Sequence, residues 1–214
     1  MISSPLGLIW RRPVWCRSLW NCPGWMGAVG LAATALAAAP GFAGCFTTTD
    51  LPKRAIYEGG STLDYIAVED EVLTYQSGEV VSRMASGLWP IDIKTPGFTV
   101  TYDWDGDLPD LAAIRDAGGS LSRNAMMKRG KGASGKVSLA VEILGQEDVV
   151  WEDCIYKAWR LRKVVTAADG KTISDGTMVF APSAFIAFST EAIDPADGSS
   201  SLFRLKALEQ GEAP

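Results

Sequence analysis

The sequence predicts a mainly β domain, built as a curved antiparallel sheet or incomplete barrel with one short helix. Many short runs alternate β-branched or aromatic residues with polar ones, the period-two pattern of half-buried strands. Glycine-containing pairs at 59–60, 77–78 and 169–170 separate these runs, as in short hairpin turns. Short connections between consecutive strands favour antiparallel pairing.

The first half of the domain supplies six of the expected strands and the helix. Asp107 can cap a helix over residues 108–117, Pro109 suits its first turn, and Gly118-Gly119 ends it. The strands are expected near residues 54–58, 62–68, 71–76, 79–85, 88–93 and 98–104.

A basic, glycine-rich loop at residues 128–136 is expected to separate this half from the second. Further strands are expected near residues 137–144, 149–151, 155–166, 177–181, 185–190 and 201–206. One helix can cover only part of such a sheet. The sheet must therefore curl and fill its interior, or leave an apolar groove for a guest. We expect the sheet to fill its interior with its own side chains, because large open apolar patches are uncommon in soluble domains.

The first 44 residues have the composition of an export signal. Arg11, Arg12 and Arg17 precede a stretch without charge from Ser18 to Thr49, and residues 26–39 read MGAVGLAATALAAA. A basic start followed by an apolar run of this length is typical of a signal peptide. The mature chain would then hold 17 basic and all 25 acidic residues, a net charge of about −8.

The end of this segment, Phe42-Ala43-Gly44-Cys45, resembles the lipobox of bacterial lipoproteins. That resemblance implies cleavage by signal peptidase II before Cys45 and attachment of diacylglycerol to its thiol. The usual Leu is replaced by Phe42. Phe46 follows the cysteine where retained lipoproteins often have Asp, which implies the outer membrane, facing the periplasm. Ordinary cleavage after Ala43, with an unmodified Cys45, and an uncleaved membrane helix are the alternatives.

The chain is accordingly divided into an export signal (1–44), a polar tether (45–53), a β-rich domain (54–208) and a loose tail (209–214). Part of the domain resembles uncharacterised β-rich periplasmic bacterial proteins, through residues 145–151 (GQEDVVW), 156–158 (YKA) and 180–182 (FAP). This resemblance implies a curved antiparallel sheet and no particular chemistry.

The composition argues against several functions. The chain contains no histidine, which excludes imidazole-based nucleophile pairs and histidine metal sites. Its net negative charge disfavours binding to nucleic acid. Asp103, Asp105, Asp107 and Asp110 do not match the glycine and glutamate positions of a calcium loop. The basic loop lacks the Ser or Thr and the following helix of a phosphate-binding loop.

Cys154 is the only other cysteine outside the export segment. We expect a buried free thiol there if Cys45 carries lipid. If Cys45 is unmodified, the two cysteines could form a disulfide in an oxidising compartment.

Together these observations predict a lipid-anchored cell-envelope protein with a non-catalytic binding or structural β-domain and no cofactor. Its partners would be the membrane, through the anchor, and an envelope protein or hydrophobic ligand. A carrier of a lipid or other hydrophobic ligand in a concave sheet is one alternative, and a carboxylate-based periplasmic hydrolase is another. A hydrolase would need two acids from different strands in one cleft, to which Glu147 or Glu152 could contribute.

Overall fold

The computed structural model describes residues 44–130, 132 and 134–211. The predicted cleavage residues Phe42 and Ala43, and the export segment before them, lie outside these residues. No helix in the described part of the chain is long and apolar enough to cross a membrane.

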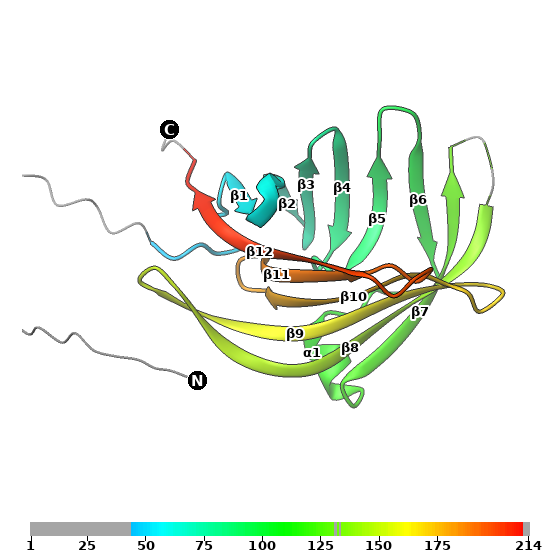
Figure 1. Cartoon of the computed structure of the whole chain (residues 1–214). Helices are drawn as coiled ribbons and strands as arrows, with labels where there is room; N and C mark the ends of the chain where they lie inside the picture. Colours follow the sequence, from blue (N-terminus) through cyan, green and yellow to red (C-terminus); the bar gives the residue numbers. More distant parts are fainter. Residues whose placement is uncertain (1–43, 131, 133, 212–214) are drawn as a thin grey trace, which may run out of the picture. The chain divides into compact units, whose positions relative to one another are not determined.

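Twelve antiparallel strands form a closed barrel, as Figure 1 shows. Each strand pairs with its neighbours in sequence, and β1 and β12 pair with each other to close the sheet. The strands are β1 (Arg54–Tyr57), β2 (Thr62–Glu69), β3 (Val72–Ser77), β4 (Val80–Ala85), β5 (Trp89–Lys94), β6 (Thr99–Trp104), β7 (Ser120–Arg129), β8 (Ser134–Trp151), β9 (Cys154–Ala167), β10 (Thr172–Ala181), β11 (Ile186–Ile193) and β12 (Ser200–Glu209). A 3-10 turn, η1 (Glu58–Gly60), joins β1 to β2.

The mainly β fold with one α-helix is confirmed, and the barrel is complete. Two strand assignments were wrong. Residues 120–129 form β7, which the sequence analysis left unassigned because Ser120–Arg129 contains no β-branched residue and no alternation. The two strands expected at 137–144 and 149–151 are one long strand, β8, with a register shift between Ile143 and Gly145.

The helix α1 (Leu111–Asp116) is shorter than predicted. Its N-cap is Asp110, whose carboxylate accepts a hydrogen bond from the Ala113 amide at 2.8 Å, so the assignment of the cap to Asp107 was wrong. α1 contacts β7 and β8. Its buried residues Leu111 and Ile114 belong to the same core cluster as Trp89 and Phe185.

This cluster fills one end of the barrel, which we call the closed end. α1 lies there, together with the β4–β5 and β10–β11 turns, and Leu88 and Trp89 are fully buried beside it. The Trp89 indole donates a hydrogen bond to the Pro109 carbonyl at 2.7 Å, which holds the segment before α1 against β5. In Figure 1, the β3–β4 and β5–β6 loops lie at the opposite end from α1.

A second cluster lies between the far end of the β8–β9 hairpin and strands β1, β11 and β12. Tyr156 and Ala158 of β9 pack there with Ile186, Phe188 and Leu205. The hairpin itself extends as a long curved pair of strands beyond the body of the barrel (Figure 1).

Two glycines allow side chains or backbone to approach closely inside the barrel. Gly87, with a positive φ of 68°, lies where an added Cβ would be 2.7 Å from the Phe180 ring. Gly176 of β10 lies where a Cβ would be 2.6 Å from the Glu191 carbonyl oxygen of β11. The second contact is with backbone, which cannot move aside without disturbing the β10–β11 pairing.

We expect Gly176→Ala to lower the free energy of unfolding by about 1–3 kcal/mol, the usual range for overpacking a tight site. Gly145→Ala is the matched control, because a Cβ there meets no atom within 4 Å, and its effect should stay within about 0.5 kcal/mol. Urea unfolding of the two variants measures the difference. Equal stability of both variants would contradict the close strand approach.

Candidate functional site

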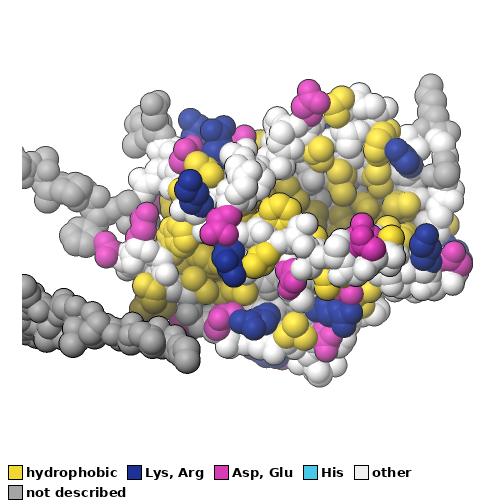
Figure 2. Space-filling model, viewed as in Figure 1, with side chains coloured by type: hydrophobic (Ala, Val, Ile, Leu, Met, Phe, Trp, Pro, Cys, Tyr) yellow, Lys and Arg dark blue, Asp and Glu magenta, His cyan; other side chains and the backbone are white. Residues whose placement is uncertain are grey.

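The barrel interior contains a cavity of about 480 Å³ whose lining is mainly apolar. This volume is within the range of pockets that hold small organic ligands. Figure 2 shows hydrophobic side chains gathered in the hollow between β3–β6 and β10–β12, with charged side chains around the outside. The apolar side chains that line the cavity include Leu63, Leu73, Met84, Met178, Phe180 and Phe185.

The lining residues extend from the closed end to the opposite rim. Gly87 and Phe185, at the β4–β5 and β10–β11 turns, line its deep part. Ser77, at the end of β3, and Phe203, near the start of β12, line it at the other rim. Phe203 remains 37% exposed there. The cavity is therefore closed at one end by the core cluster that contains Leu111 and Ile114 of α1, which we call the α1 cluster. It is reached from the opposite rim.

The expectation of a filled interior holds at the closed end only. An eight-stranded barrel is just wide enough for its own side chains to fill, and width grows with strand number. Twelve strands enclose more space than their own side chains fill. The α1 cluster fills this space at one end, and no side chain of the described residues fills it at the other.

Lys163 of β9 is the one basic residue among those that line the cavity. Strand pairing places it in register with Val141 of β8 and Gly176 of β10, and Gly176 with Ala192 of β11. Because paired residues share a face of the sheet, the Lys163 side chain points inward.

The Lys163 ammonium lies at the deep part of the cavity. Its Nζ donates a hydrogen bond to the Leu88 carbonyl, in the β4–β5 turn, at 2.6 Å. No ion pair involves it among the described residues. Burial lowers the pKa of Lys163 to about 8, and no opposing charge offsets this shift.

Asp175 and Glu191 are the two acids among the residues that line the cavity, and both carboxylates have partners of their own. Asp175 alternates with the inward Gly176 and forms a bidentate ion pair with Arg162, at 3.0 Å and 2.7 Å. Arg162 holds the pKa of Asp175 below its usual value through hydrogen bonding. Glu191 alternates with Ala192 and accepts a 3.5 Å hydrogen bond from Thr177. Neither acid is placed to neutralise Lys163.

Tyrosine hydroxyls add neutral polar groups to the same interior. The Tyr57 hydroxyl donates to the Ala187 carbonyl, and that of Tyr65 donates to the Phe185 carbonyl, each at 3.1 Å. Burial raises the pKa of Tyr57 to about 12. These groups therefore stay uncharged at neutral pH and support the wall around the β10–β11 turn.

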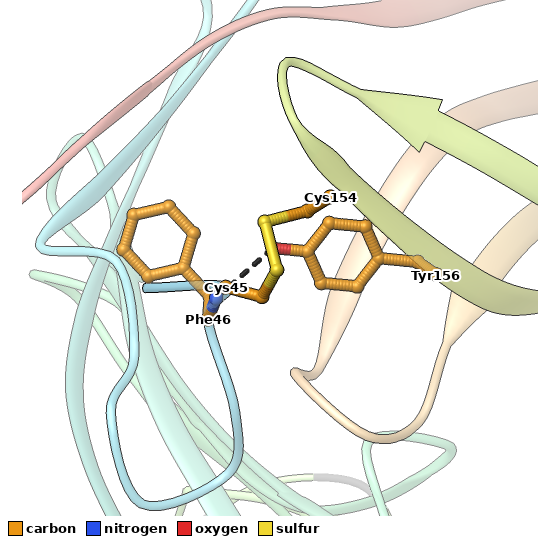
Figure 3. The surroundings of a disulfide bond; sticks show 4 residues. All are labelled: Cys45, Phe46, Cys154 and Tyr156. Atoms are coloured by element: carbon orange, nitrogen blue, oxygen red, sulfur yellow. Dashed lines mark hydrogen bonds between the residues drawn. A yellow bond between two sulfur atoms is a disulfide. The ribbon is translucent and has the colours of Figure 1, made fainter. Parts of the chain in front are cut away.

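Cys45 forms a disulfide with Cys154, the first residue of β9 (Figure 3). Their Cα atoms are 5.6 Å apart. The prediction that Cys154 is a free thiol was wrong. Lipidation of Cys45 stays a prediction, and the two modifications exclude each other because both use the same sulfur atom. The structure shows the chain with this sulfur in the disulfide, the arrangement expected for an unmodified Cys45.

The predicted tether is docked on the barrel. The Phe46 amide donates to the Tyr156 hydroxyl at 3.0 Å (Figure 3), and the Phe46 ring packs against the second cluster. Thr47 and Asp50 bridge each other, and Gly44 is exposed. At the other terminus, Glu209 belongs to β12 and not to a loose tail.

The other candidate groups are occupied by structural contacts. Asp103 pairs with Lys128 at 3.4 Å, and Glu147 pairs with Arg160 at 3.1 Å. No group of three Asp, Glu, Cys or His in the described residues could hold a metal ion. The basic loop is the β7–β8 hairpin turn, with Lys128 and Lys136 inside the flanking strands.

Sequence reasoning did not identify Lys163. The signal was present, because Leu161, Lys163 and Val165 alternate with Arg162 and Val164 in one strand. A lysine on the apolar side of a strand differs from its neighbours, but only the structure shows that it lines the cavity.

Comparison with solved structures gives a structural neighbour of low sequence identity. It is the hypothetical lipoprotein YmcC from Escherichia coli (K12), with a TM-score of 0.41 and 10% sequence identity over 73% of this chain and 88% of that chain. No protein-family model matches this chain, and no curated protein matches it.

The disulfide closes a loop with a sequence separation of 109 residues. In the chain-entropy model, a loop of this length constrains the unfolded state by about 4–5 kcal/mol. We expect Cys154→Ser to lower the free energy of unfolding by about 2–5 kcal/mol, measured in denaturant. Peptide mapping of the unreduced wild-type protein should recover Cys45 linked to Cys154. Diacylglycerol on Cys45, with Cys154 as a free thiol, would contradict this assignment.

Proposed function

We propose that this protein is a non-catalytic binding protein of the bacterial cell envelope that holds a hydrophobic ligand inside its barrel. The one-ended cavity of about 480 Å³ carries this proposal. It favours the carrier of a hydrophobic ligand over the partner-binding or structural β-domain that the sequence predicts first. A cavity of this kind, lined by Leu63, Leu73 and Phe180, leaves apolar surface that a hydrophobic guest would remove from water.

The wall of the cavity is built to keep its shape without a ligand. The sheet is closed, and the α1 cluster packs Trp89 edge-to-face on Trp104, with ring centroids 5.6 Å apart. Both indoles donate hydrogen bonds of 2.7 Å to backbone carbonyls, of Pro109 and Pro90. A preformed cavity loses little conformational entropy when it binds a guest.

The envelope location rests on two observations. The first 44 residues have the composition of an export signal, and the Cys45–Cys154 disulfide is typical of an oxidising compartment such as the periplasm. If Cys45 carries lipid, the protein is anchored to a membrane, and the outer membrane is the expected one. Ordinary cleavage after Ala43 would instead release a protein with the disulfide.

A partner-binding role is the second candidate, and one surface feature favours it. Val150 and Ile155 lie opposite each other near the tip of the β8–β9 hairpin and are 68% and 67% exposed. An exposed apolar pair at a projecting tip is a plausible contact point for another envelope protein. A hydrolase has less support, since Asp103 and Glu147 form separate surface ion pairs with Lys128 and Arg160.

A neutral hydrophobic fluorophore such as diphenylhexatriene tests the proposal. We expect the wild-type protein to bind it with one site per chain, and Ala187→Phe to weaken binding at least tenfold by filling the cavity. Ala140→Phe is the control, because Ala140 alternates with the buried Leu139 and Val141 and faces outward. If Ala187→Phe does not fold, Met178→Phe tests the same space. Absence of saturable binding to the wild-type protein would contradict the proposal.

A further inference from the structure

We propose that the cavity selects amphiphiles that carry one anionic group, and that Lys163 binds this group at the closed end while the apolar chain extends toward the open rim. This inference rests on the proposed function and names the class of ligand.

The charge of Lys163 is the first argument. An ammonium has three donors, and the described residues supply one acceptor, the Leu88 carbonyl. A buried cation without a counter-charge costs free energy, so cavities that retain one normally pair it with an acid. Here the two acids among the lining residues, Asp175 and Glu191, are hydrogen-bonded to Arg162 and Thr177 and not to Lys163. A ligand anion would supply the missing partner.

The residues that surround Lys163 on the neighbouring elements also carry no counter-charge. Val141 lies beside it on β8, Gly176 on β10 and Leu88 in the β4–β5 turn. The tyrosines of the lining, Tyr57 and Tyr75, have pKa values raised by burial and are neutral.

Two other cations, on β9 and β7, have partners of their own. Arg162 pairs with Asp175 on the outer face. Arg123 of β7 donates to the Asp107 and Ser122 carbonyls. Lys163 is therefore the cation that a ligand in the cavity would meet.

The shape of the cavity sets the orientation. The Lys163 Nζ is hydrogen-bonded at the β4–β5 turn, next to Gly87 in the deep part of the cavity. Between this turn and the rim the lining includes the apolar side chains of Met178 and Leu63 along the wall and Phe203 at the rim. A carboxylate or phosphate head group would thus lie deep, and an acyl or similar chain would point outward.

The experiment compares cis-parinaric acid with the corresponding alcohol, which has the same fluorescent chain and no charge. At pH 6.5 we expect the wild-type protein to bind the acid about 10- to 100-fold more tightly than the alcohol, the usual effect of a hydrogen bond to a charged group. Lys163→Met should remove this preference by weakening the binding of the acid more than that of the alcohol. Lys157→Met is the control, because it removes the same charge from an exposed position of β9.

The pH dependence gives a second readout. Lys163 is protonated below about pH 8 in the empty cavity, and the ligand carboxylate is ionised throughout the range from pH 6.5 to 10. The preference for the acid should therefore be complete at pH 6.5 and fall as the pH rises past 8. A bound anion raises the pKa of Lys163, so this fall begins near pH 8 and continues up to the higher pKa of the complex. Lys163→Met should show no such change.

The outcomes separate the inference from the proposed function. Equal affinity of the wild-type protein for acid and alcohol overturns the role of Lys163 and leaves the hydrophobic site intact. A Lys163→Met variant that loses both ligands equally shows a structural role for the lysine and also overturns the inference. Failure of either ligand to bind the wild-type protein contradicts the proposed function, and the inference with it.

Discussion

The pairing of β1 with β12 is the constraint on which the rest of the structure depends. Arg54–Tyr57 and the end of β12 lie in antiparallel register, with Arg54 opposite Glu209. This pairing removes both edges of the sheet and fixes the number of strands in the wall at twelve. Because the width of a closed barrel follows its strand number, strand side chains alone cannot fill the interior. The closed end, the cavity and the position of Lys163 all follow from this.

The interior of the barrel is filled at one end and hollow in the rest. At one end, α1 and two turns contribute Leu88, Trp89 and Ile114, which are fully buried. The rest of the interior is the cavity, and β9, β10 and β11 place Lys163, Gly176 and Ala192 in register in its wall. Retaining a lysine without a counter-charge beside that space costs stability, which is the trade-off expected at a binding site.

Much of the fold could be predicted from the sequence. Hairpin signals such as Asp169-Gly170 and the alternation within β9 are local, so they are visible in one segment. β7 was missed because its stability comes from pairing with β6 and β8 and not from its own residues. Closure was not predictable, since it depends on residues about 150 apart in the chain meeting in register. The cavity and the Cys45–Cys154 contact are long-range in the same sense, and for Cys45 the lipobox resemblance pointed to another modification.

A crystal structure of the protein grown with a terminally brominated fatty acid tests the central claim most directly. The bromine is located by its anomalous signal independently of the protein model. The account predicts a bromine position inside the barrel near the rim at Phe203, with the carboxylate within hydrogen-bond distance of the Lys163 Nζ. A barrel whose interior is filled by its own side chains in that crystal, or a ligand bound with its carboxylate at the rim and away from Lys163, would contradict it.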